Sequence, residues 1–393
     1  MTHLRNRFVE TEIAKKMSYS PCVGLVGMRQ VGKSTLLQRF AKEYHTFDEQ
    51  GFLLRFEANS QSFLEVAQFP LALDEIQKSP MAFDAVKYVV DRKKTPGRFL
   101  MSGSVRFASR KQIRESLTGR IALIELLPFT VAECHQRSLS SFVDKMEKSK
   151  ADEVVKQLKK KSWVTNSELT KYLETGGLPG ICFRRDAKIR REMFEDHLET
   201  LLARDIQLVR KVQIPYSKLR HILSEIAVLE GRGLNMSVLA QLVGSSVPTI
   251  KNLLQAMENL FLIRSYGKTY FIQDCGLSQH LSFKPVSLDR NGLIHLVYHE
   301  LVAQINYTHR LGVKFSPLQS RGGLNVPFFI EYQSGRKLGI FIEETDHPTH
   351  KVLNSFAALK KKYSNFEGVL FYQSDLWHQT NKGLHCVPLT ALF

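Results

Sequence analysis

Residues 24–37 read GLVGMRQVGKSTLL, and this stretch decides how the N-terminal part of the chain is expected to fold. The segment from Gly27 to Ser34 fits the pattern GxxxxGK[ST]. An apolar run typical of a buried strand precedes it, and apolar residues at helical spacing follow it. The N–H groups of such a loop and the positive end of the next helix form a phosphate site. The alternative is a glycine-rich turn with an unrelated lysine, which the flanking strand and helix make the weaker interpretation.

A second apolar strand, LALDE, follows and ends in Asp74 and Glu75. In a parallel sheet the carboxyl ends of the strands carry the functional side chains. We expect Lys33 to reach phosphate oxygens, Ser34 and Asp74 to hold Mg²⁺, and Glu75 to activate the attacking water as general base. The two carboxylates could instead cap a helix that begins near Ser79.

The third strand, GRFLMSGS, ends in Ser102, Gly103 and Ser104. At the tip of a strand beside the Asp-Glu strand, Ser102 or Ser104 would sense the terminal phosphate. Either serine could equally cap the following helix, and both interpretations remain open. Arg120, in SLTGR, is a candidate arginine finger that acts within its own chain or on a neighbouring subunit.

Several short segments occur in an order that resembles a known family. GMRQVGKSTLL, LALDEIQKSP, FLMSGS, SLTGR, TGGLPG and LLARDI are similar to the successive signatures of a family of prokaryotic AAA-type ATPases, over about residues 1–390. The resemblance implies ATP binding, ATP hydrolysis and Mg²⁺ as cofactor. It also implies a winged-helix segment and a last domain similar to restriction-endonuclease folds, but no particular biological role.

On this basis we expect an ATPase with one contiguous nucleotide-binding loop. The residues expected to contact ATP are Gly27, Met28, Arg29, Gln30, Val31, Gly32, Lys33, Ser34 and Thr35. The metal ligands are expected to be Ser34 and Asp74, and the catalytic residues Glu75, Arg120 and Ser104.

The predicted fold class is α/β, in three domains. Residues 1–136 form a parallel-sheet P-loop ATPase domain, residues 137–290 a helical, winged-helix-like domain, and residues 291–393 a small restriction-endonuclease-like α/β domain. Residues 138–161 are polar and charged, which predicts a solvated helix or a mobile insertion. Residues 217–266 have the layout of a helix-turn-helix, and YGKTYFI is a candidate wing hairpin.

The chain has a formal net charge of +17, which is typical of proteins that meet an acidic polymer. Nine basic residues and one acid lie between Arg92 and Arg120, and this basic patch is the candidate DNA-binding surface. The helix-turn-helix segment is nearly neutral, which favours a structural or protein-contacting role for it. A protein partner, a homo-oligomer, or the nucleotide of a neighbouring subunit could also account for the charge.

The last hundred residues lack most of a nuclease metal site. Glu300 fits the helix glutamate of the pattern, but Asn325-Val326-Pro327 stands where the hairpin Asp is needed and Thr345 where the lysine is needed. We therefore do not expect nuclease activity.

Features of export and membrane insertion are missing from the sequence. The five cysteines are widely spaced, the N-terminus lacks an apolar signal core, and no apolar run is long enough to span a bilayer. These features predict a cytoplasmic protein with reduced thiols and no membrane partner.

Overall fold

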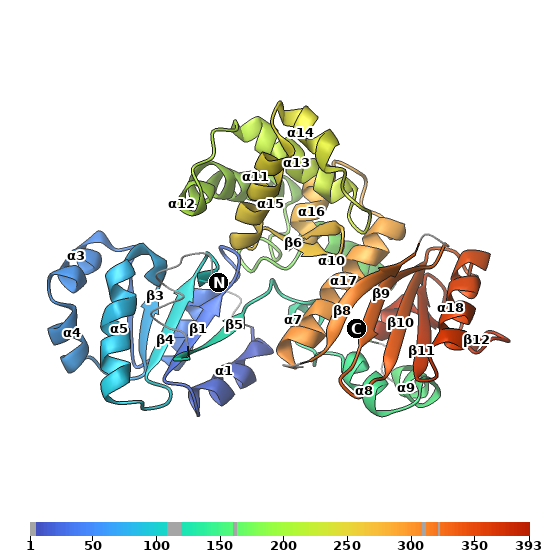
Figure 1. The fold of residues 1–393 in the computed structure, drawn as a ribbon, viewed down its shortest axis with the longest axis horizontal. Coiled ribbons are helices and arrows are strands. Elements are labelled where there is room, and N and C mark those ends of the chain that lie inside the picture. The colour runs from blue at the N-terminus through green and yellow to red at the C-terminus, as the bar shows by residue number, and fades with distance from the viewer. Residues whose placement is uncertain (1–4, 108–118, 160–162, 309–311, 321–322) are drawn as a thin grey trace.

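The computed structural model describes residues 5–107, 119–159, 163–308, 312–320 and 323–393. Figure 1 shows three lobes: an N-terminal sheet with its helices, a helical lobe, and a C-terminal sheet with its helices. Among the residues that the structure describes, no helix combines the length and the apolar character that a membrane crossing needs.

The N-terminal lobe is built on a parallel five-stranded sheet with the strand order β2-β3-β4-β1-β5. The strands are β1 (Cys22–Val26), β2 (Glu43–Thr46), β3 (Leu71–Asp74), β4 (Phe99–Gly103) and β5 (Ile121–Glu125). The helical elements are α1 (Val9–Met17), α2 (Lys33–Phe40), α3 (Gln50–Ala58), α4 (Ser60–Val66), the short η1 (Ile76–Lys78) and α5 (Pro80–Arg92). Strands β1, β3 and β4 are buried along their whole length, as their continuous apolar runs predict.

The helical lobe contains the predicted series of three helices and a hairpin. Gly244, with φ +66°, ends the second of these helices in the left-handed conformation that glycine adopts without strain. The elements of the lobe are α10 (Asn166–Thr175), α11 (Ala187–Glu199), the π-helical turn η3 (Thr200–Asp205), α12 (Ile206–Val209), α13 (Tyr216–Val228), α14 (Met236–Val243), α15 (Val247–Asn259), β6 (Ile263–Tyr266), β7 (Thr269–Ile272) and α16 (Cys275–Ser282).

The C-terminal lobe has a mixed six-stranded sheet with the order β12-β13-β11-β10-β9-β8. Helix α17 is buried along most of its length. It contacts β10 of its own lobe, α10 of the helical lobe and α8 (Phe142–Lys148), so it lies between the two lobes. The elements are α17 (Arg290–Tyr307), β8 (Lys314–Gln319), β9 (Asn325–Glu331), β10 (Lys337–Glu343), α18 (His350–Lys362), β11 (Phe366–Tyr372), β12 (His378–Gln379), β13 (His385–Pro388) and η4 (Leu389–Leu392).

The polar segment 138–161, expected to be a solvated helix or a mobile insertion, is helical in its described part but packs on the C-terminal lobe. It forms α8 (Phe142–Lys148) and α9 (Ala151–Lys159), which follow the short α7 (Val131–Cys134). Both helices pack with the C-terminal lobe: the rings of Phe142 and Phe371 lie 5.4 Å apart, and the Tyr332 hydroxyl donates to the Val143 carbonyl at 2.9 Å. The predicted division therefore assigns these helices to residues 137–290, whereas they pack on the lobe of residues 291–393.

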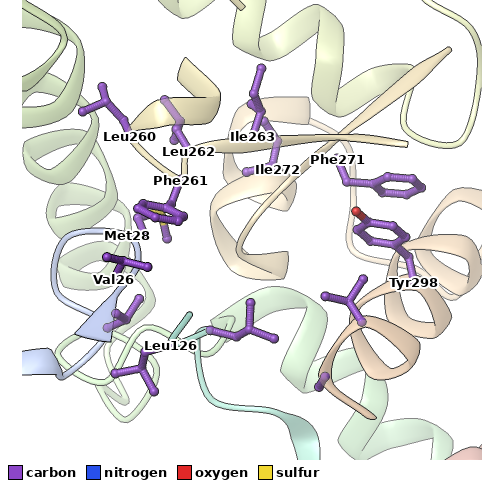
Figure 2. Close-up of a cluster of buried hydrophobic side chains, with 14 of the residues drawn as sticks. Val26, Met28, Leu126, Leu260, Phe261, Leu262, Ile263, Phe271, Ile272 and Tyr298 are labelled. Carbon is purple, nitrogen blue, oxygen red and sulfur yellow. The ribbon is translucent and has the colours of Figure 1, made fainter. Parts of the chain in front are cut away.

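One apolar core runs through all three lobes. Figure 2 shows Val26 and Met28 of the N-terminal lobe beside Phe261, which joins α15 to β6 in the helical lobe. Met28 and Phe261 are each 1% exposed. The nucleotide-binding loop predicted from the sequence is therefore packed directly against the helical lobe.

Candidate active site

The loop between β1 and α2 is tightly turned at both of its glycines. Gly27 has φ +155°, and a Cβ there would lie only 2.4 Å from the Leu126 carbonyl oxygen. Gly32 has φ +98°, a left-handed conformation in which a side chain is strained. Gln30, a non-glycine residue, also has a positive φ of 66°. The sequence pattern thus places glycines where the backbone requires them.

Lys33 begins α2, and its ammonium group lies in the hollow of the loop. Its Nζ donates to the carbonyl oxygens of Gly27 and Met28, at 3.1 and 3.0 Å. Burial lowers the pKa of Lys33, while the carboxylates of Glu75 and Asp74 act in the opposite direction. The loop therefore presents its one ammonium group next to the two predicted carboxylates.

Asp74, at the end of β3, is held by hydroxyl groups from two neighbouring strands. Its Oδ2 accepts a hydrogen bond from the Tyr44 hydroxyl at 2.6 Å, and its Oδ1 accepts one from Ser102. Burial, together with the Asp74 carboxylate, raises the pKa of Tyr44, and the Ser34 side chain acts on that hydroxyl in the opposite sense. The Asp74 carboxylate is thus bonded to Tyr44 and Ser102, next to the loop that carries Ser34.

Glu75 follows Asp74 and has an uncommon backbone conformation for a non-glycine residue, with φ 50° and ψ 40°. Its Oε2 accepts hydrogen bonds from the Ser104 hydroxyl at 3.0 Å and from the Gln77 side chain. Its N–H donates to the Ser102 hydroxyl at 3.1 Å. The two serines at the end of β4 are thus divided between the carboxylates, Ser102 on Asp74 and Ser104, directly after the strand, on Glu75.

The remaining residues of the loop contact other parts of the chain. The Val31 carbonyl accepts from the Arg7 guanidinium at 2.9 Å, and Arg29 forms an ion pair with Asp205 of η3 at 3.1 Å. Thr35 is exposed in the first turn of α2. All nine residues assigned to nucleotide contact therefore lie in or directly after this loop, but Met28, Arg29 and Val31 also bind the loop to its surroundings.

Arg120 lies at the end of the sheet where the parallel strands begin, opposite to the end that carries the loop. It precedes β5, and the pairing of Cys22 with Ile121 puts it level with the start of β1, whereas the loop follows the end of β1. Its guanidinium binds the Asp91 carboxylate, with Nη2 3.0 Å from Oδ2. The structure therefore contradicts the interpretation of Arg120 as an arginine finger for the loop of its own chain.

The basic patch includes Arg110, Lys111 and Arg114, which lie outside the described residues. Two arginines of the patch that the structure does describe, Arg98 and Arg106, make contacts within the chain. Arg98 stacks on Phe69 at 4.2 Å, and the Arg106 Nε donates to the Glu258 carbonyl at 3.1 Å while its guanidinium stacks on Phe261 at 4.7 Å. These contacts place the two arginines in packing roles and give the DNA interpretation no support.

Four functional candidates were missed by motif analysis: Arg7, Tyr44, His197 and Asp205. Asp205 belongs to the LLARDI segment, so its signal was present, but no pattern indicated that it pairs with Arg29 of the loop. His197 is 1% exposed, and neither of its ring nitrogens makes a hydrogen bond within the described residues. Burial lowers the pKa of His197 to about 4, and the charges of Arg29 and Lys33 act in the same direction. A neutral imidazole therefore lies close to the loop cations.

The carboxylates of the nuclease pattern are not brought together. The first residue of α17, Arg290, contacts Glu343 and Glu344, with its Nη1 3.4 Å from Glu343 and its N–H 2.9 Å from Glu344. Glu300 comes ten residues later in the same helix, a distance of about 15 Å along the axis. It is 2% exposed and accepts from the Gln304 side chain at 2.8 Å. The helix glutamate therefore lies apart from the strand carboxylates.

This burial of Glu300 has a measurable effect on stability. Desolvation raises the pKa of the Glu300 carboxyl to about 7. A carboxyl whose pKa is higher in the folded state stabilises the fold at low pH, and that stabilisation is lost as pH rises from about 4.5 to about 7. We expect Glu300→Gln to gain about 2–3 kcal/mol relative to wild type between pH 5 and pH 8, measured by urea unfolding. Exposed Glu192→Gln is the control, and an equal pH dependence of both variants would contradict the assignment.

Comparison with known proteins agrees with the geometry of the N-terminal lobe. Residues 19–135 match the model of a family described as an AAA domain, and residues 166–271 match a domain of unknown function. Two uncharacterized proteins, from Mycobacterium bovis and Mycobacterium tuberculosis, are each 25% identical over 295 residues. The match covers 74% of this chain and 59% of theirs, so the chain spans less than two thirds of the length of these relatives.

Three solved structures also resemble the chain, at low TM-scores. A Walker-type ATPase of Pyrococcus abyssi is 15% identical, with a TM-score of 0.40 over 71% of this chain and 96% of its own. A DNA replication initiation factor is 14% identical, with a TM-score of 0.27 over 77% and 88%. A signal-transduction ATPase of Pyrococcus horikoshii with a tetratricopeptide repeat sensor is 12% identical, with a TM-score of 0.26 over 79% and 48%.

The family match, the parallel sheet and the glycine-lysine loop define the class of the N-terminal lobe. It is similar to the P-loop domains of AAA-type ATPases, as the sequence predicts.

Proposed function

We propose that the chain binds ATP with Mg²⁺ in the loop between β1 and α2 and hydrolyses it. The observation that carries the proposal is the pair of carboxylates at the end of β3, each held by its own serine at the end of β4, beside the buried ammonium of Lys33. A hydrolytic P-loop site needs these groups for two separate tasks, binding the metal and activating water.

The contacts of the residues indicate how each would act. Lys33 exchanges its bonds to the Gly27 and Met28 carbonyls for phosphate oxygens, and the N–H groups at the start of α2 bind the same anion. Ser34 and Asp74 hold Mg²⁺, which neutralises charge on the phosphates when it is bound. Glu75 takes the proton of the attacking water, and Ser104 orients its carboxylate. Arg120 can act only on the nucleotide of a neighbouring copy.

The principal alternative is a nucleotide-gated scaffold with little turnover. One observation favours it: the loop contacts the helical lobe through the apolar packing of Met28 on Phe261 and through the Arg29–Asp205 ion pair. A change in the loop on nucleotide binding would reach the helical lobe through these contacts whether or not ATP is hydrolysed. Single-turnover hydrolysis by the wild type separates the two functions, because the scaffold would bind ATP and release it unchanged.

Removing the charge of Lys33 tests nucleotide binding. We expect Lys33→Met, which keeps the length and packing of the side chain, to weaken binding of Mg²⁺-ATP at least tenfold, because a charge-assisted bond to phosphate is lost. Binding is measured by equilibrium titration with fluorescent ATP, and thermal unfolding shows whether the variant is folded. Exposed Lys42→Met is the matched control. An unchanged affinity in folded Lys33→Met would refute the site.

A further inference from the structure

A second cluster of polar side chains lies outside the loop, where α16 meets α17 (Figure 1). Cys275 begins α16, and His295 and His299 are one turn apart in α17. One potential ligand atom from each of the three lies within 4.8 Å of the others. Within the described parts of the chain, this is the only group of three or more Cys, His, Asp or Glu side chains close enough to share a metal ion.

Both histidines are held by partners that determine which nitrogen is free. The Nδ1 atom of His295 lies 2.6 Å from the Glu230 carboxylate, which accepts a hydrogen bond from Nδ1–H, so Nε2 is the nitrogen that can bind another group. This Nε2 is buried and makes no hydrogen bond in the described structure. The Nε2 atom of His299 lies 3.0 Å from the Ile272 carbonyl, which can only accept, so its Nδ1 carries the lone pair.

This arrangement is typical of histidines that bind metals. A ligating imidazole usually donates its other N–H to a carboxylate or a backbone carbonyl, which fixes the tautomer and the ring orientation. The two partners here are one of each kind. Glu230 is also fully engaged, because it accepts from the Ile272 N–H at 2.7 Å and from the Ser278 hydroxyl at 2.9 Å. Glu230 therefore orients the His295 ring, and the candidate metal ligands are Cys275, His295 and His299.

The donor set selects the kind of ion. One thiolate and two imidazoles suit Zn²⁺, whereas Mg²⁺ and Ca²⁺ prefer oxygen ligands. The charges also match, because the Cys275 thiolate and the Glu230 carboxylate together balance a divalent cation. Cys275 and His295 are 1% and 3% exposed, while His299 is partly exposed, so solvent can supply a fourth ligand only from the His299 side.

We propose that Cys275, His295 and His299 bind Zn²⁺ and thereby tie α16 of the helical lobe to α17. This site is separate from the ATP site and does not depend on the proposed function. The competing explanation is a metal-free network in which the His295–Glu230 ion pair and the thiol simply satisfy one another.

The test is a titration of the full-length protein, free of affinity tag and treated with chelator, with Co²⁺ as the optical probe. Thiolate ligation gives a near-ultraviolet charge-transfer band, and four-coordinate Co²⁺ gives intense visible bands. We expect both to saturate at one equivalent and to disappear on addition of Zn²⁺. Zinc should also raise the unfolding temperature, because it binds the folded state. Absence of the bands in folded wild type would overturn the site, and failure of Zn²⁺ to displace the bound Co²⁺ would overturn the choice of ion.

Two variants and a control connect the signal to these residues. Cys275→Ala should abolish the charge-transfer band, and Glu230→Gln should weaken zinc binding about 10–100-fold through loss of orientation. Cys22→Ala, which removes another fully buried thiol, should leave zinc binding unchanged. Equal zinc affinity in wild type and Cys275→Ala would refute the proposal. If Cys275→Ala does not fold, the wild-type titration and the Glu230→Gln affinity still decide the question.

Discussion

Glu75→Gln is expected to hydrolyse ATP roughly 10²–10³-fold more slowly than the wild type while it still binds Mg²⁺-ATP. The amide keeps the size of the side chain and can accept hydrogen bonds from Ser104 and Gln77, but it cannot take a proton from water. The loop, Lys33 and Asp74 are unchanged, so binding of the phosphates should remain.

The measurement is phosphate release in a single turnover, combined with an equilibrium titration of fluorescent ATP. Glu65→Gln, an exposed glutamate of the same lobe, is the control for loss of a negative charge. Hydrolysis at the wild-type rate would show that another group is the base. If the variant loses both ATP binding and ATP hydrolysis, Glu75 contributes to the nucleotide pocket itself.

Arg7→Ala is expected to lower the free energy of unfolding by about 3–5 kcal/mol. The Arg7 guanidinium is buried, pairs with Glu133 at 3.0 Å, and donates to the carbonyl oxygens of Val31 and Leu127 at 2.9 and 2.6 Å. It also stacks on the Phe129 ring at 4.4 Å. Truncation leaves Glu133, which is 1% exposed, as a buried charge without its counter-ion.

Urea unfolding measures this loss, and two further variants identify its cause. Arg39→Ala breaks a more exposed ion pair with Glu10, so it should cost about 0–1 kcal/mol. Arg7→Met combined with Glu133→Gln removes both charges and should be more stable than Arg7→Ala. A loss in Arg7→Ala as small as that in Arg39→Ala would mean that Glu133 finds another partner or becomes protonated.

Local patterns predicted the strand, the glycine turns and the helix around Lys33 well, because these features are contiguous in sequence. The glycines, Lys33 and Ser34 lie within eight residues, and Asp74 and Glu75 end an apolar strand. The order of elements in the helical lobe was also predictable from apolar spacing and from Gly244. These features require no knowledge of which segments meet in space.

Contacts between distant segments could not be predicted in this way. Asp205 meets Arg29 across 176 positions, and Glu133 meets Arg7 across 126. No pattern in one sequence indicates such pairs. The packing of segment 138–161 was not predicted for another reason. The segment is rich in charged residues, so its few apolar side chains, including the buried Phe142, Val143 and Met146, did not form a clear pattern.

The distance of Arg120 from the loop of its own chain could have been predicted from the sequence. In a parallel sheet every strand begins at the same edge, and the nucleotide loop follows the end of a strand. Arg120 directly precedes β5, so it had to lie at the starting edge. The same reasoning applies to Arg98, which directly precedes β4.

The packing of Phe261 against Met28 means that the nucleotide-binding lobe is not an independent module. Cutting the chain after residue 136 would expose Val26, Met28 and Leu126, which Figure 2 shows in the shared core, at a cost of up to about 1.5–3 kcal/mol for each fully buried apolar side chain. The surface of the helical lobe that faces the loop is therefore part of the structural support of the loop, although that lobe supplies none of the groups proposed to contact phosphate.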